Sequence, residues 1–186
     1  MFIAQAKRKE NIAEYILYIW QLEDLLRAVQ FSPEAIWSKL VVPQIPDDQH
    51  KQNDLLVWYM DLCSLLREED KIQNGHLDHT LRLISDLQDL HSELLTAPAG
   101  EHYRKLYAAL LPELAALRKA IGKEDISDIE LAFRSLYAVM LYRIKGDDSK
   151  ENTNSEIIGL ISPLIGELAR IFHAVERGEI DIWEQD

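Results

Sequence analysis

The sequence predicts an all-α protein: a single multi-helix bundle of about seven mostly antiparallel helices, two of them with interior prolines. Gly and Pro make up only 13 of 186 residues, against roughly 12% in average proteins. The 28 Leu residues far outnumber the 6 Val residues, which favours helices over strands. Apolar residues recur at spacings of three and four along most of the chain. We expect one domain over residues 1–178, followed by a tail over 179–186.

Helices are predicted over residues 6–30, 33–42, 49–73, 77–95, 101–121, 127–145 and 154–178. The first is apolar on nearly all sides, which is typical of a helix at the centre of a fold. The second begins at Ser32-Pro33, an N-cap followed by a proline at the first helical position. A Pro-containing connector precedes the third helix, and Asn74-Gly75 is expected to cap that helix at its C-terminus.

The later helices are marked by prolines and capping boxes. Pro112 and Pro163 lie opposite the apolar stripes of their helices, so we expect kinks that leave the core faces intact. Capping boxes begin at Ser127 and Thr153. The predicted inward stripe of the sixth helix contains Ile129, Phe133, Leu136, Met140 and Ile144. The tail is either loose or docked through Ile180, Ile182 and Trp183.

The net charge of −12 argues against nucleic-acid binding, because such a chain repels phosphate backbones. The only dense basic run, Lys7-Arg8-Lys9, supports a weak third hypothesis of nucleic-acid regulation. The single cysteine, Cys63, excludes an intrachain disulfide and is expected to be a core residue. The start has the wrong order for a signal peptide, and no uncharged run is long enough for a membrane span. We therefore expect a cytoplasmic protein with no membrane partner.

Glu23 is the most informative residue, because it falls within the apolar arc of the first helix. A carboxylate on an apolar face is costly unless it is paired, ligated or protonated. Arg27 lies four residues later, in the favourable order for a helical ion pair. The favoured interpretation is a structural Glu23–Arg27 pair, and the other is a carboxylate that lines a ligand or metal site.

His91 also lies on an apolar face, where a histidine is most often a core residue with one hydrogen bond. To act as a ligand or a general acid–base, it would need Glu23 or another carboxylate nearby. His76 and His79 share a helical face and are weak metal candidates, although exposure at a helix start is the simpler interpretation. The sequence contains no Glu-x-x-His, His-Glu-x-x-His or P-loop pattern, so we favour a protein that is not an enzyme and has no cofactor.

Two features favour a symmetric homodimer. The sixth helix has a second apolar face, formed by Leu131, Ala138, Leu141 and Tyr142. The last helix has a strip of small residues opposite its apolar stripe, formed by Gly159, Ser162 and Gly166. A helix that is apolar on two faces is either central or covered by another subunit.

The run from Lys7 to Ala28, KRKENIAEYILYIWQLEDLLRA, resembles the opening of a small bacterial family known only as a domain of unknown function. The likeness extends over most of the chain and includes Trp20, Glu23 and Arg27. It implies an all-helical, cytoplasmic bacterial protein and brings no established activity.

Two functions remain open. The leading hypothesis is a non-enzymatic interaction or small-ligand-binding protein, with Glu23, Arg27 and His91 at an internal polar spot. The alternative is a metal-dependent enzyme that uses the same three residues. The aromatic residues Trp20 and Tyr59 are expected beside the site, and Tyr15 is a third aromatic neighbour.

Overall fold

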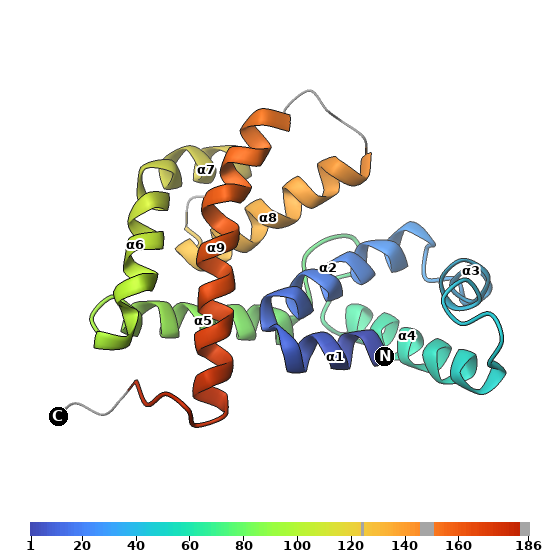
Figure 1. Cartoon of the computed structure of the whole chain (residues 1–186). Coiled ribbons are helices and arrows are strands. Elements are labelled where there is room, and N and C mark those ends of the chain that lie inside the picture. Colours follow the sequence, from blue (N-terminus) through green and yellow to red (C-terminus); the bar gives the residue numbers. More distant parts are fainter. Residues whose placement is uncertain (124, 146–150, 183–186) are drawn as a thin grey trace. The chain divides into compact units, whose positions relative to one another are not determined.

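The computed structural model describes residues 1–123, 125–145 and 151–182, and these residues form helices and no strands (Figure 1). The all-α prediction is therefore confirmed, and the predicted number of seven helices is approximate. The α-helices are α1 (Phe2–Glu10), α2 (Ile12–Ala28), α3 (Pro33–Ile36), α4 (Gln49–Glu68), α5 (Asp78–Leu94), α6 (Glu101–Leu110), α7 (Leu114–Ile121), α8 (Asp128–Lys145) and α9 (Glu151–Glu176).

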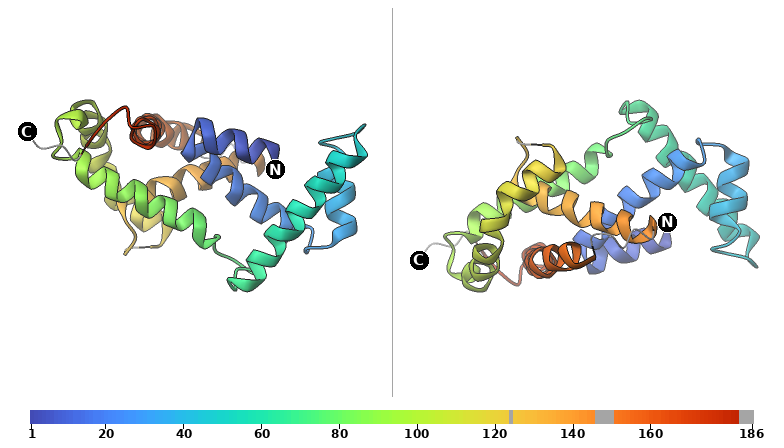
Figure 2. Two further views of the ribbon diagram at one scale, coloured as in Figure 1. Left: turned by 90° about the horizontal axis from the view of Figure 1, so that it is seen from below. Right: turned by 90° about the horizontal axis from the view of Figure 1, so that it is seen from above.

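Backbone contacts divide the chain into two compact units. The first unit contains residues 1–10 and 14–82, and the second contains residues 11–13 together with the chain from residue 83 onward. In the first unit, α3 packs against α4 (Figure 2). In the second, α9 packs against both α6 and α8, and α7 packs against α8. The predicted division into residues 1–178 and a tail stays a prediction.

The predicted first helix is wrong as one continuous element, because the chain breaks at Asn11. The Asn11 side chain accepts a hydrogen bond from the Ala13 N–H (3.0 Å), so it offers the backbone an alternative to continued helix. The Ile12 N–H donates to His173 Nε2 (3.1 Å), and both residues belong to the second unit. Asn11 is thus a helix-start signal in the middle of the apolar pattern.

The predicted third helix is also too long, since α4 ends at Glu68 rather than near residue 73. Asp70 adopts a left-handed backbone conformation with φ of 59°. The Lys71 N–H donates to Leu66 O (2.7 Å), and the Asp70 N–H donates to Arg67 O (3.2 Å). These two bonds form a Schellman cap, so Asn74-Gly75 is not the C-cap. Residues 69–77 instead form a loop, the α4–α5 loop, before α5 begins.

Several local signals are confirmed. The Ser32 side chain caps α3, and the Ser127 side chain accepts a hydrogen bond from the Glu130 N–H (3.1 Å) at the start of α8. Pro112 interrupts the helical run with a 3-10 turn between α6 and α7. Pro163 lies inside α9.

Two expectations for the later helices are wrong. α9 begins at Glu151, upstream of the predicted start at Thr153. Ile144, expected in the core, is 62% exposed near the end of α8. A helical stripe near a helix end stays buried only if another element covers it. The predicted stop at Gly146 and the docking of Trp183 lie outside the described residues.

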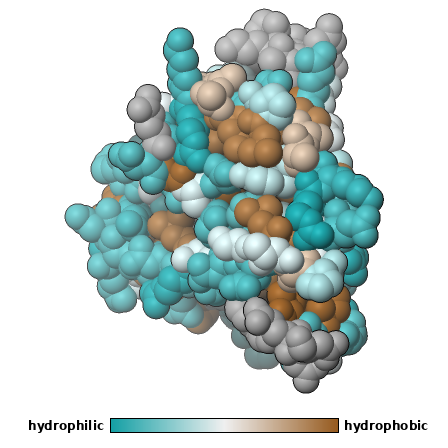
Figure 3. All heavy atoms as spheres, turned by 90° about the vertical axis from the view of Figure 1, so that its left-hand side faces the viewer, coloured by the Kyte–Doolittle hydropathy of each residue, from teal (hydrophilic) through white to brown (hydrophobic). Residues whose placement is uncertain are grey.

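The core of each unit includes residues of the predicted apolar stripes. In the first unit, Ile19, Leu22 and Leu26 of α2 pack with residues of α4 that include Tyr59 and the buried Cys63. In the second, buried residues of α9 such as Leu164 and Leu168 belong to the helix that packs on α6 and α8. On the α6 side of Figure 1, apolar surface forms small separate islands among hydrophilic residues (Figure 3).

One stretch of the described residues, Ser155–Glu176, has the length and composition of a membrane-spanning helix. It lies in α9, and 44% of its most apolar window is buried within the structure. Because α9 packs against α6 and α8, its apolar stripe has the surroundings of a core helix. This stretch is weak evidence for a membrane location.

The start of the tail docks onto the second unit. Ile182 is 9% exposed and lines a groove of about 320 Å³ together with Leu90 of α5 and Phe172 of α9. Docking through Ile182 is therefore confirmed.

Candidate functional site

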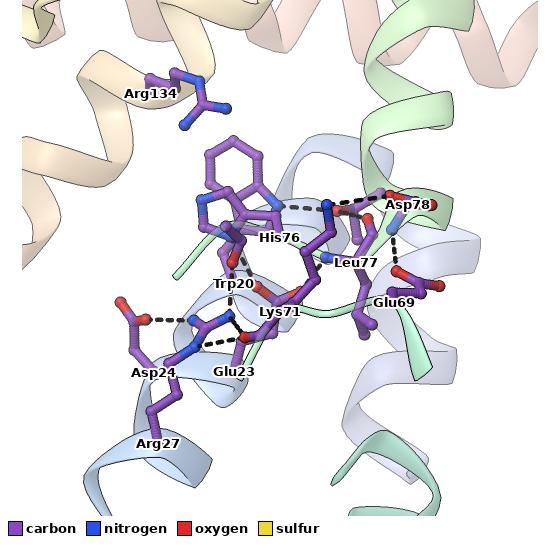
Figure 4. Close-up of polar contacts among 12 residues, drawn as sticks. Trp20, Glu23, Asp24, Arg27, Glu69, Lys71, His76, Leu77, Asp78 and Arg134 are labelled. Carbon is purple, nitrogen blue, oxygen red and sulfur yellow. Dashed lines mark hydrogen bonds and ion pairs between the residues drawn. The ribbon is translucent and has the colours of Figure 1, made fainter. Parts of the chain in front are cut away.

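Three side chains of α2, Trp20, Glu23 and Arg27, hold the α4–α5 loop (Figure 4). They follow one another at spacings of three and four, so they lie along one face of the helix. Glu23 is fully buried, as its place in the apolar arc predicts. We call these three residues, with the loop residues that they contact, the α2–loop network.

Both oxygens of the Glu23 carboxylate have hydrogen-bond partners in the loop. Glu23 Oε2 lies 2.7 Å from His76 Nδ1, and Glu23 Oε1 accepts the Leu77 N–H at 3.0 Å. Because a buried carboxylate is costly without such partners, these bonds explain how Glu23 is accommodated. They also fix the backbone one residue before α5 begins.

The predicted Glu23–Arg27 pair is wrong. The Arg27 guanidinium donates to Asp24 Oδ1 (2.8 Å), to Lys71 O (3.2 and 2.9 Å) and to Gly75 O (2.6 Å). A guanidinium has five N–H donors in a fixed fork, which suits several acceptors at once. Arg27 therefore joins two carbonyl groups of the loop, while Glu23 is satisfied by His76.

Trp20 completes the network from the other end of the α2 face. Its Nε1–H donates to Thr80 Oγ1 (3.0 Å), and the Thr80 hydroxyl donates to Leu77 O (2.8 Å). The Trp20 ring also stacks on His76, with ring centroids 3.8 Å apart and an interplanar angle of 9°. Trp20 thus contacts both the end of the loop and the first turn of α5.

His76 and His79 are directed to different partners. His76 bonds to Glu23, whereas His79 Nε2 lies 3.2 Å from the Tyr15 hydroxyl. Burial lowers the pKa of His79, and the nearby Glu23 and Glu69 carboxylates partly oppose this change. Within the part of the chain that the structure describes, no three His, Cys, Asp or Glu side chains form a group suited to a metal ion.

His91 has its polar partner within the second unit. Its Nδ1 lies 2.6 Å from the Tyr103 hydroxyl, and its ring meets the rings of Tyr103 and Tyr107 edge to face. Burial lowers the pKa of His91, and Asp128 opposes this change. The hydrogen-bond partner of this buried histidine is thus a tyrosine, as expected of a core histidine.

Tyr59 lies in the core of the first unit. Its hydroxyl accepts a hydrogen bond from Gln44 Nε2 (2.8 Å), and burial raises its pKa. Of the predicted site residues, the structure thus brings Trp20, Glu23 and Arg27 together around one loop, and it adds His76. Tyr59 and His91 each have other partners.

The polar groups of the α2–loop network are used in bonds to one another. Among the described residues, no buried side-chain nitrogen or oxygen lacks a hydrogen-bond partner. A carboxylate bound to an imidazole and an amide is chemically able to exchange a proton. The arrangement found here nevertheless serves first to hold a loop in place.

A surface pocket in the first unit was not predicted from the sequence. It has a volume of about 530 Å³ and is lined by Met1, Ala4, Gln5, Arg8, Lys9, Tyr15 and Trp58. We call it the α1 pocket, since most of its lining comes from α1. The signal was present in the sequence, because residues 1, 4, 5 and 8 share one helical face.

The fold and the α2–loop network define a class of protein: an all-helical one in which a buried glutamate fastens an interhelical loop. The chain belongs to the family described as domain of unknown function DUF4924, whose model matches residues 1–179. No curated protein and no solved structure matches the chain. The family resemblance expected from residues 7–28 is confirmed.

Proposed function

We propose that the protein is a non-enzymatic small-ligand-binding protein and that its ligand occupies the α1 pocket. The observation that carries the proposal is the lining of this pocket. Its volume of about 530 Å³ falls within the range typical of small-molecule sites. Among the residues that the structure describes, the lining offers two cationic side chains and two aromatic rings, and includes no carboxylate, imidazole or thiol. Such a set can bind and orient a molecule, but it supplies no carboxylate–imidazole pair for general acid–base catalysis.

The α2–loop network supports the same proposal. Glu23 and His76 are the carboxylate and imidazole that an internal site would use, and they bond to each other at 2.7 Å. Trp20 and Arg27 are likewise engaged with α5 and the loop. We infer that these residues stabilise the first unit, which contains the α1 pocket.

We also propose that the protein acts in the bacterial cytoplasm as a homodimer. The first part rests on the resemblance of residues 7–28 to a bacterial family. For the dimer, Tyr142 of α8 is 39% exposed, although Leu131 of the same predicted face is buried. Gly159 and Gly166 on α9 face open space, so another helix can approach closely there. Light scattering coupled to size-exclusion chromatography tests this proposal: a monomeric mass at micromolar concentration contradicts it.

The first experiment is native mass spectrometry on untagged protein. Retained mass that matches a small molecule, and that is lost in Trp58→Ala but kept in Trp37→Ala, supports the proposal. The control removes a tryptophan that does not line the pocket. If only the bare chain is seen, a thermal-shift screen of small organic compounds against wild type and Trp58→Ala follows. The proposal is contradicted if the screen finds no compound that raises the melting temperature of wild type more than that of Trp58→Ala.

Retained mass that matches a metal ion would support the alternative, a metal-dependent enzyme that uses Glu23. In that case, Glu23→Gln should abolish the metal mass while Trp58→Ala leaves it unchanged.

A further inference from the structure

The α1 pocket has a local charge opposite to that of the whole chain. The net charge is −12, yet within the described parts of the chain the charged side chains that line the pocket are Arg8 and Lys9. Lys7, the third cation of the same run, does not line it and instead pairs with Glu14 at 2.6 Å. Arg8 and Lys9 of this run therefore line the pocket, whereas Lys7 does not.

The charge of Arg8 acts at the pocket itself. Burial raises the pKa of Tyr15, and the Arg8 guanidinium opposes this rise, so its positive charge is close enough to affect the phenol. The C-terminal end of α1 contributes a partial negative charge equivalent to about half an elementary charge. The two cationic side chains that line the pocket carry a larger charge of the opposite sign.

The other walls of the pocket are aromatic and apolar. The Tyr15 ring is held in place by the hydrogen bond between its hydroxyl and His79 Nε2 (3.2 Å). The Trp58 ring is tilted against Tyr59, with centroids 5.3 Å apart and an interplanar angle of 41°. Both rings are half-buried, so part of each surface remains open to a ligand. Aromatic side chains of this kind favour flat, unsaturated partners.

Building on the proposed function, we propose that the ligand of the α1 pocket is an organic anion with a planar aromatic part. Its anionic group, whether carboxylate, sulfonate or phosphate, lies at Arg8 and Lys9. Its ring lies against Tyr15 and Trp58. Charge complementarity with Arg8 and Lys9 favours the anionic group, and packing against Tyr15 and Trp58 favours the aromatic ring. The net charge of −12 repels anions at long range. The preference for an anionic ligand therefore arises from short-range contacts inside the pocket, where screening by salt is weaker.

The test is a series of probes with one ring system and three charges: 2-naphthoate, 2-naphthamide and 2-naphthylmethylammonium. Dissociation constants are measured with the full chain from the change in tryptophan fluorescence and by titration calorimetry. We expect 2-naphthoate to bind at least about tenfold more tightly than the amide, a difference of about 1.4 kcal/mol. We expect the ammonium probe to bind more weakly than the amide. The preference for the anion should shrink as salt is raised.

Matched variants show which pocket residues contact the anionic group of the probe and which contact its ring. Lys9→Gln should reduce the affinity for 2-naphthoate several-fold and leave the affinity for 2-naphthamide unchanged. Lys119→Gln, which removes the same charge from an exposed position of α7, should change neither. Trp58→Leu should weaken binding of both probes. Circular dichroism confirms that each variant is folded, and Arg8→Lys, which keeps the charge, should retain the preference for the anion.

The outcomes separate this inference from the proposed function. If the amide or the ammonium probe binds as tightly as 2-naphthoate or more tightly, the inference is overturned. The proposal that the α1 pocket binds a small molecule still stands in that case. Inorganic phosphate that binds as tightly as 2-naphthoate overturns the aromatic half. If none of the three naphthyl probes binds below about millimolar concentration, the inference fails, and the compound screen decides separately whether the pocket binds anything.

Discussion

The indole ring of Trp20 lies parallel to the imidazole ring of His76, with centroids 3.8 Å apart and planes 9° from parallel (Figure 4). Trp20 is held by its bond to Thr80, and His76 by its bond to Glu23. The stack therefore joins two hydrogen bonds that each link α2 to the region where the α4–α5 loop enters α5. This arrangement makes the loop a fixed part of the first unit.

Glu23→Gln tests whether the buried carboxylate is structural. Gln retains an oxygen for the Leu77 N–H but loses the charge-assisted bond to His76. We expect the free energy of unfolding to fall by about 1–3 kcal/mol, measured by urea denaturation. Hydrogen exchange at the Leu77 amide should become faster.

The control for Glu23→Gln is Glu14→Gln, since Glu14 is exposed and pairs with Lys7 at the surface. Glu14→Gln should lower the free energy of unfolding by no more than about 1 kcal/mol. A Glu23→Gln protein with unchanged stability and a lost ligand would favour a binding site around Glu23 instead.

Arg27→Lys should loosen the loop without removing the positive charge. A lysine ammonium cannot reproduce the fork that bonds Lys71 O, Gly75 O and Asp24 together. We expect faster limited proteolysis within residues 69–77 and a loss of about 1–3 kcal/mol in the free energy of unfolding. Arg82→Lys, at an exposed position of α5, is the matched control, and equal cleavage rates in both variants would contradict the prediction.

The stability of the protein should fall in mild acid, in part through His91. Burial lowers the pKa of His91 in the folded state, so the unfolded chain binds more protons between the folded value and the ordinary value of about 6.5. The contribution of the neutral, buried His91 to the free energy of unfolding is therefore fully present above the ordinary pKa, and it is lost as pH falls below that value. His79, whose pKa burial also lowers, adds a change of the same sign.

This pH dependence is measured by urea denaturation of wild type and His91→Gln at about pH 7.5 and about pH 5.5, values on either side of the ordinary imidazole pKa. The difference between the two pH values should be smaller in His91→Gln than in wild type. His50→Gln serves as the control, because the His50 side chain is 89% exposed. Identical pH dependence in wild type and His91→Gln would contradict the prediction.

Gly100→Ala should be strongly destabilising, because a Cβ at this position would lie 1.9 Å from the carbonyl oxygen of Leu94. Backbone must shift to relieve that overlap, so we expect a large drop in melting temperature. Gly166→Ala, inside α9 with open space around it in the single chain, should instead stabilise the folded monomer by about 0.5–1 kcal/mol. Calorimetric scans of both variants give the comparison, and a Gly100→Ala protein as stable as wild type would show that this turn adapts.

Much of the fold could be predicted because its signals are local. Ser32 and Ser127 cap helices through bonds to residues three positions later, and Pro112 interrupts a helix by its own geometry. The stop of α4 at Glu68 was missed, since its cap uses a left-handed Asp70 rather than a glycine. The break at Asn11 was missed because the apolar period continues through it.

The sequence by itself determined that Glu23 and His91 are buried, because each occupies an apolar face of its helix. It also placed Trp20, Glu23 and Arg27 on one side of α2. Only the tertiary structure decided what they bind: His76 reaches Glu23 from 53 positions away, and the Lys71 carbonyl reaches Arg27 from 44. Helical periodicity fixes the direction of a side chain, whereas the partner it meets depends on how distant segments of the chain pack.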